Sequence, residues 1–193
     1  MCLGCIRRVD IVNTVSPHAN RYALKHNLAT TQKTARLLKA IGLLVCAVDI
    51  DDSKLEHAKR LGADITINAK NGDPAVEVKK ATGGGAHCVL ITAPSLSAFK
   101  QGVGMTRKSG TCVLVGIPPG EFPTPLFELV ANCITIRGSF VANRRDMAEP
   151  LAFAAAGKVK ADIELKPLSA INQVFDRLAH GDVPSRVVLN FAA

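Results

Sequence analysis

Asp49 is placed where its side chain could bind a ligand. Six apolar residues run unbroken from 43 to 48 and end on this aspartate. A continuous apolar run is typical of a parallel strand that is buried on both faces. An acidic residue at the carboxyl end of such a strand can accept hydrogen bonds from the ribose hydroxyls of a dinucleotide. The same pattern suits a buried strand followed by an ordinary capping aspartate, and this stretch alone favours neither interpretation.

Two later turns could contribute to the same site. The apolar run 88–91 is followed by Thr-Ala-Pro at 92–94, and the run 111–115 is followed by Gly-Ile-Pro-Pro at 116–119. In a doubly wound sheet, ligands bind outside the carboxyl ends of the strands. These turns and Asp49 would then line one crevice. They are equally compatible with three ordinary turns at one edge of a sheet.

The elements that would position these residues alternate regularly from residue 43 onward. Gly62 ends the first expected helix as a C-cap, and Asp73 with Pro74 opens the second. Alternation at this spacing predicts right-handed crossovers and a parallel sheet, and hence an α/β fold. Strands are expected at 43–48, 63–68, 88–92, 111–116, 134–139 and 186–191, helices at 54–61, 74–81, 95–105, 126–131, 146–156 and 170–179, and a turn at 108–110.

Residues 1–42 lack this regularity. No glycine occurs between Gly4 and Gly42, and no long periodic apolar pattern joins the short apolar pieces. A short helix over 30–40 is expected there. Because it contains arginine and is poor in acids, the segment also resembles a transit peptide, although its apolar face is weak.

The net charge of +8 is unevenly distributed. Residues 1–44 carry seven basic residues and one acid, whereas the remainder carries seventeen basic residues and fifteen acids. Proteins that bind nucleic acid usually spread a basic face over the folded domain and add aromatic platforms for single strands. Aromatic residues make up only 4% of this chain. Nucleic acid is therefore not an expected partner.

The cysteines and the hydropathy pattern indicate a reduced protein that does not enter a membrane. The six cysteines are scattered, and those at 46, 88 and 112 lie in apolar runs, where a cysteine usually acts as a small hydrophobe. We expect a cytoplasmic protein with no disulfide framework. No apolar stretch reaches membrane-spanning length, so neither a transmembrane helix nor a membrane partner is expected.

Two local motifs carry little weight. The three glycines at 83–85 follow an expected helix and precede an expected strand, whereas a phosphate loop needs the opposite order. We interpret them as a turn. Cys2-x-x-Cys5 has metal-ligand spacing, but one such pair without a second is a weak signal.

Five stretches, in their order and spacing, resemble the zinc-dependent alcohol dehydrogenases of the medium-chain dehydrogenase group, and most of all the bacterial propanol-preferring type. The resemblance covers about residues 39–193 and is highly specific there. The stretches are AVDIDDSKLEHAKRLGAD, ATGGGAH, LVGIPPGEFP, ITIRGS and DVPSRVVLNF.

The resemblance implies a cofactor site. Asp49 matches the family aspartate that accepts both adenosine ribose hydroxyls and selects NAD over NADP, and Lys54 matches a basic residue beside that ribose. Arg186 matches an arginine that meets the pyrophosphate. The turns that contact the nicotinamide half are matched by Thr92, Val115, Gly116 and Ile117.

Two departures from the family pattern limit the activity we expect. The amino-terminal catalytic domain, which carries most zinc ligands in the family, is missing, so we assign no catalytic residue and no metal ligand. The glycine-rich turn expected about 20 residues before Asp49 is replaced by HNLATT at 26–31. Side chains there would block close approach of the backbone to a pyrophosphate, so NAD binding is expected to be weak or lost.

The amino-terminal segment suggests a hypothesis about its origin. Residues 1–4 resemble the family segment that bears the last catalytic-zinc cysteine, which would be Cys2. The chain length is kept while identity to the family fails from Cys5 to Leu38. We hypothesise a displaced reading frame over that span, later restored. Coding DNA with no family-like peptide in its other frames would contradict this.

The sequence thus predicts a Rossmann-like doubly wound parallel sheet, with a damaged first βα unit, over residues 43–145. An aberrant segment precedes it at 1–42, and residues 146–193 match a piece of the family's catalytic domain. The family reaction converts a primary alcohol and NAD to an aldehyde and NADH. We expect this chain to be inactive alone and to form homo-oligomers. The alternative is a non-catalytic fragment that associates with a full-length relative.

Overall fold

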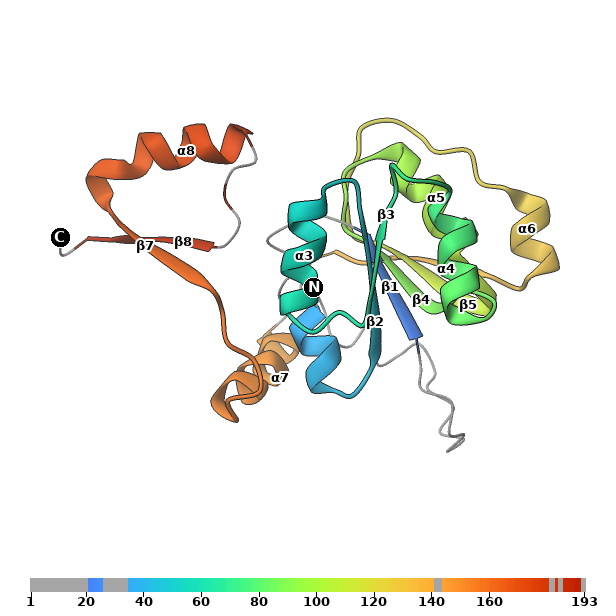
Figure 1. Cartoon of the computed structure of the whole chain (residues 1–193), viewed down its shortest axis with the longest axis horizontal. Helices are drawn as coiled ribbons and strands as arrows, with labels where there is room; N and C mark the ends of the chain where they lie inside the picture. The colour runs from blue at the N-terminus through green and yellow to red at the C-terminus, as the bar shows by residue number, and fades with distance from the viewer. Residues whose placement is uncertain (1–20, 26–34, 141–143, 181–182, 184–185, 192–193) are drawn as a thin grey trace. The chain divides into compact units, whose positions relative to one another are not determined.

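The chain folds into two compact units, Met1–Val159 and Lys160–Ala193. The computed structural model describes residues 21–25, 35–140, 144–180, 183 and 186–191 (Figure 1). Among these residues, no helix is both long and apolar enough to cross a membrane. Each unit is considered by itself below.

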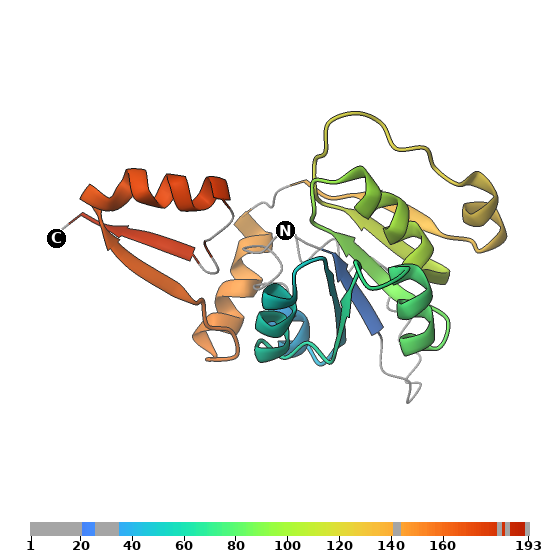
Figure 2. The same cartoon turned by 45° about the horizontal axis from the view of Figure 1, so that its top comes forward.

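The first unit contains a six-stranded parallel sheet in the order β3-β2-β1-β4-β5-β6. Helix α3 covers one face, and α4 and α5 cover the other (Figure 2). The strands are β1 (Arg21–Lys25), β2 (Leu44–Asp49), β3 (Ile65–Asn68), β4 (Ala86–Ile91), β5 (Thr106–Leu114) and β6 (Thr135–Gly138), and the helices are α3 (Asp52–Arg60), α4 (Pro74–Thr82), α5 (Leu96–Met105), α6 (Leu126–Ala131) and α7 (Arg144–Ala155).

Alternate residues of β2 enter two separate hydrophobic clusters. Val45 and Ala47 pack in the cluster that contains residues of α3, whereas Cys46 and Val48 pack in the cluster that contains residues of α4 and α5. All four are buried. The unbroken apolar run is therefore explained by a strand covered on both faces, and the predicted doubly wound α/β fold is confirmed.

Local capping sets the ends of the helices, close to the predicted bounds. Asp51 is the N-cap of α3 and accepts a hydrogen bond from the Ser53 backbone N–H at 2.9 Å. Asp73 caps α4 in the same way, accepting from the Ala75 N–H at 2.8 Å, with Pro74 as the first helical residue. Gly83 ends α4 in the left-handed conformation, with φ of 66°. The glycines at 83–85 therefore form a turn between a helix and a strand, as predicted.

Strand β1 was not predicted from the sequence. It lies between β2 and β4 and is parallel to both. Its sequence, RYALK, has charged residues at both ends and only three residues between them, so it carries no recognisable apolar run. The HNLATT stretch at 26–31 and the first twenty residues lie outside the described residues. Within the predicted helix over 30–40, residues 35–40 are helical.

Strand β5 begins earlier than predicted. Residues 108–110, expected as a turn, belong to the strand, and the register with β4 shifts between Ala86 and Cys88. Ser109 has φ of 56°, a conformation that is uncommon outside glycine. The left-handed residue and the register shift make the start of the strand irregular, which explains why its sequence has the pattern of a turn.

The second unit pairs two parallel strands under one helix. These are β7 (Ile163–Pro167), β8 (Arg186–Asn190) and α8 (Ile171–His180), with the short η1 helix (Leu168–Ala170) before α8. Arg177 of α8 binds both carboxylate oxygens of Glu164 at 3.1 Å, and this guanidinium, with Lys166, lowers the pKa of Glu164. Strand β7 was not predicted, although apolar and polar residues alternate over 163–166 as they do in a half-buried strand.

Helix α7 is grouped with the first unit, whereas the sequence predicts that the chain from residue 146 onward belongs to the tail. The match of residues 146–193 to the family's catalytic domain stays a prediction.

Candidate functional site

The carboxyl ends of all six parallel strands lie along one edge of the first sheet. Lys25, the last residue of β1, is paired with Val48 of β2 and with Ile91 of β4. Asp49 follows Val48 and Thr92 follows Ile91. Both therefore lie one position beyond the level of Lys25, on either side of β1. The strand order brings two of the predicted site residues to the same edge, where doubly wound sheets bind ligands.

The Asp49 carboxylate is held by its own turn. One oxygen, Oδ1, accepts hydrogen bonds from the backbone N–H groups of Ile50 at 2.6 Å and Asp51 at 2.8 Å. The carbonyl of Asp49 accepts a further bond from the Ala69 N–H at 2.7 Å. With only 2% of its surface exposed, Asp49 is an oriented acidic group at the end of β2.

Lys54 lies in the first turn of α3, near the same edge. Its Nζ is 3.8 Å from Oδ2 of Asp51, so the two form a partly exposed ion pair. Hydrogen bonding by Ser53 lowers the pKa of Asp51 and keeps its carboxylate ionised. Lys54 follows Asp49 by five positions, and its predicted place beside the ribose stays a prediction.

The turns after β4 and β5 pack tightly against each other. The backbone N–H groups of Val115 and Gly116 both donate to the Ile91 carbonyl at 2.9 Å. A Cβ on Gly116 would lie 2.5 Å from the Ala93 carbonyl oxygen, so only glycine fits there without a shift. Thr92 is buried. These contacts bring together three of the four residues predicted for the nicotinamide half.

The two remaining predicted site residues are Ile117 and Arg186. The Ile117 side chain is 74% exposed, directly after Gly116. Arg186 begins β8 in the second unit, where its backbone N–H donates to the Asp162 carbonyl at 3.3 Å. Its predicted contact with a pyrophosphate stays a prediction.

Asn68 is a polar residue of this edge that was not predicted from the sequence. It ends β3 and is the register partner of Asp49. Its side-chain Nδ2 donates to Oδ1 of Asp52 at 2.6 Å. The signal that could have identified it is its place as the last residue of the predicted strand at 63–68.

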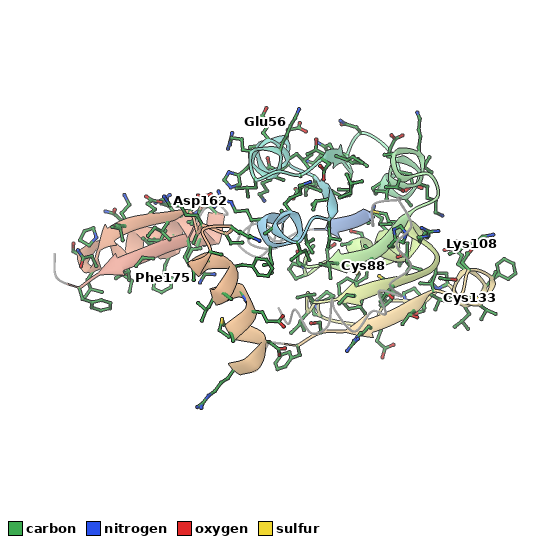
Figure 3. The ribbon with its side chains drawn as sticks, turned by 90° about the horizontal axis from the view of Figure 1, so that it is seen from below. Glu56, Cys88, Lys108, Cys133, Asp162 and Phe175 are labelled. Carbon is green, nitrogen blue, oxygen red and sulfur yellow. The ribbon has the colours of Figure 1, made fainter. Side chains whose placement is uncertain are left out.

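No group of three or more His, Cys, Asp or Glu side chains that could hold a metal ion occurs within the described part of the chain. Burial raises the pKa of Cys46, Cys88 and Cys112 to about 12 each, so these thiols stay protonated. Figure 3 shows Cys88 within the sheet. Cys2 and Cys5 lie outside the described residues. The described residues therefore do not fit a catalytic zinc, and we derive no step through one.

The same residues do fit the two ends of a dinucleotide. An oriented carboxylate at the end of β2 suits ribose hydroxyls, and a close-packed turn after β4 and β5 offers backbone groups to a second ring. The stretch between them, which would meet the pyrophosphate, starts after Lys25 and lies outside the described residues.

Comparison with known proteins points to one family. The sequence profile of the zinc-binding dehydrogenase family matches residues 32–156. The chain is 52% identical over 152 residues to an alcohol dehydrogenase of Moraxella sp. (strain TAE123), covering 79% of this chain and 45% of that protein. It is 50% identical over 151 residues to an alcohol dehydrogenase of Geobacillus stearothermophilus, covering 78% and 44%.

A solved structure agrees in fold over nearly the whole chain. The alcohol dehydrogenase of the hyperthermophilic archaeon Aeropyrum pernix superposes with a TM-score of 0.81 at 27% identity, covering 95% of this chain and 53% of that one. The chain thus spans about half the length of the relatives it matches.

The chain belongs to the zinc-binding dehydrogenase family. It corresponds to the NAD-binding portion of a zinc-dependent alcohol dehydrogenase.

Proposed function

We propose that this chain binds NAD weakly through the adenosine end, as the coenzyme portion of a propanol-preferring type of alcohol dehydrogenase, and does not turn over alcohol by itself. The observation that carries the proposal is the oriented Asp49 carboxylate at the end of β2, beside the strand that precedes a dinucleotide turn in this fold. Lys54, in the first turn of α3, is the residue we expect beside the same ribose.

We expect NAD binding to be weak because of the part of the site that would hold the pyrophosphate. A pyrophosphate needs a turn whose backbone approaches closely, and the sequence after β1 has no glycine before Gly42. Hydride transfer in this family also depends on a zinc that polarises the alcohol oxygen. A catalytic zinc needs three protein ligands and an open position. Cys2 is the one family ligand matched in the sequence.

Titration of the purified chain with NADH, followed by nicotinamide fluorescence, tests the proposal. We expect saturable binding that Asp49→Ala weakens. Glu56→Ala is the matched control, because Glu56 is an exposed acid on the outer side of α3 (Figure 3). Equal binding by the chain and by Asp49→Ala would contradict the assignment, and so would an absence of NADH binding.

A second candidate is a non-catalytic fragment that acts by associating with a full-length relative. Helix α6 supports it, because it has no buried residue and exposes 72% of Leu126, 84% of Phe127 and 78% of Val130. Three large apolar side chains on one short helix, beside the edge strand β6, are typical of an association surface. Mixing the chain with a full-length relative, and measuring the relative's activity and mass, separates this candidate from the first.

A further inference from the structure

Asn68 connects two turns at the edge of the sheet where we propose that the adenosine end of NAD binds. These are the turn after β2 and the turn after β3. As the last residue of β3, it lies beside Asp49 in the sheet register. Its side-chain Oδ1 accepts from the Lys70 N–H at 2.9 Å, and its Nδ2 donates to Oδ1 of Asp52 at 2.6 Å. One side chain therefore joins the turn after β3 to the first residue of α3.

The orientation of this amide is determined by its two partners. The Lys70 N–H is a donor and needs the oxygen, whereas the Asp52 carboxylate is an acceptor and needs the nitrogen. A flipped amide would lose both hydrogen bonds. The bond to Asp52 is also assisted by charge, which makes it stronger than a bond between neutral groups.

The contact lies at the far end of the turn that holds Asp49. That turn begins at Asp49, whose Oδ1 accepts from the N–H groups of Ile50 and Asp51, and it ends at Asp52. Its near end is tied to the residue after β3 by the bond from the Ala69 N–H to the Asp49 carbonyl, at 2.7 Å. Its far end is tied to the last residue of β3 by the bond from Asn68 to Asp52, so both ends of the turn are anchored at the end of β3.

We propose that Asn68 is a positioning residue for the adenosine end of NAD. Its amide fixes the β2–α3 turn and so holds the Asp49 carboxylate in the orientation that accepts the ribose hydroxyls. This inference rests on the proposed function, since it concerns the same ligand. It assigns Asn68 an indirect part, because Asn68 acts through the turn that carries Asp49.

Exchanging the amide and the carboxylate between positions 68 and 52 tests the proposal. Asn68→Asp places two carboxylates against each other, so the turn should loosen and NADH affinity should fall about tenfold. Adding Asp52→Asn to that variant restores one donor and one acceptor with their positions reversed, and should recover most of the affinity. Asn71→Ala, an exposed change in the same loop, is the matched control and should bind as the unmodified chain does.

Amide hydrogen exchange at Ile50, Asp51 and Ala69 supplies a readout that needs no cofactor. We expect Asn68→Asp to speed exchange at these three amides, the double variant to slow it again, and the melting temperature to stay near that of Asn71→Ala. Unchanged exchange in Asn68→Asp, or unchanged NADH affinity, would overturn the inference.

The two measurements also separate this inference from the proposed function. If the unmodified chain binds no NADH, the proposed function fails and the role toward NAD fails with it. If it binds NADH and the double variant stays as weak as Asn68→Asp, the proposed function stands and the positioning role of Asn68 is wrong.

Discussion

Gly116 and Ala93 come so close that a Cβ on Gly116 would lie 2.5 Å from the Ala93 carbonyl oxygen and 2.8 Å from its carbonyl carbon. The neighbours are backbone atoms, which cannot rotate away as the end of a side chain would. Because residue 116 has no side chain, the turn after β5 can pack directly against the backbone of the turn after β4. This packing sets the distance between two of the turns at the candidate site.

Replacing Gly116 by alanine should force the two turns apart. We expect a loss of about 1–3 kcal/mol in the free energy of unfolding, which is typical of overpacking. Gly138→Ala is the control, because a Cβ there meets nothing within 4 Å. Urea unfolding of both variants measures the difference. Equal stability of the two variants would show that the turns can separate freely.

Cofactor preference should depend on Asp49. A carboxylate at this position repels the 2′-phosphate of NADP, so the chain should bind NADH more tightly than NADPH. Asp49→Gly should weaken NADH binding and bring the two affinities closer together. Fluorescence titration with each cofactor gives the ratio. Tighter binding of NADPH by the unmodified chain would contradict the assignment of Asp49.

Stability should fall in acid partly because of Asp64. Its carboxylate binds Lys39 Nζ at 2.8 Å and the Val45 N–H at 2.7 Å. Partial burial raises the pKa of Asp64, but the hydrogen bonds from Lys39 and Val45 outweigh it, and the pKa lies below its usual value. The contribution to stability is therefore complete above the unfolded pKa of about 3.9 and is lost as the pH falls through the lower folded value.

Asp64→Asn should reduce this acid dependence. The partners are about one third exposed, so we expect the pair to contribute no more than about 1 kcal/mol. Urea unfolding between pH 7 and pH 3 measures it, with Lys70→Gln as the control for a charge change on an exposed lysine. An identical pH dependence of stability in Asp64→Asn and in the unmodified chain would count against this ion pair.

Self-association should depend on α6. Phe127→Glu places a charge on the exposed apolar surface of that helix and should shift the chain toward the monomer. Val76→Glu is the matched control, because Val76 is also an exposed apolar residue but lies on α4. Light scattering at high concentration measures the mass. A monomeric unmodified chain would contradict the prediction.

Alcohol dehydrogenase activity should be absent from the purified chain, even with added zinc and NAD. Positioning and electrostatic stabilisation supply most of the rate in such reactions, so each missing part costs orders of magnitude. The measurement is NADH formation from ethanol or propanol against a blank. Zinc-dependent formation that Asp49→Ala abolishes would show that the amino-terminal segment supplies what we consider missing.

Much of the fold follows from the sequence because the signals are local. The apolar run at 43–48 and the capped start at Asp73 and Pro74 depend on neighbours in the chain, and the structure has β2 and α4 there. Asp49 could be assigned as a candidate for the same reason, since it directly follows a run that is apolar throughout. The order of these signals was enough to predict a parallel sheet.

Tertiary structure alone decided the rest. RYALK becomes the strand β1 because β2 and β4 hydrogen-bond to it from both sides. The five residues themselves, with charged side chains at both ends, give no signal that predicts this pairing. Asn68 joins the candidate site because the sheet register sets it beside Asp49, 19 positions away in the chain. Contacts between distant segments depend on how strands are ordered and aligned, which a pattern read along the chain does not contain.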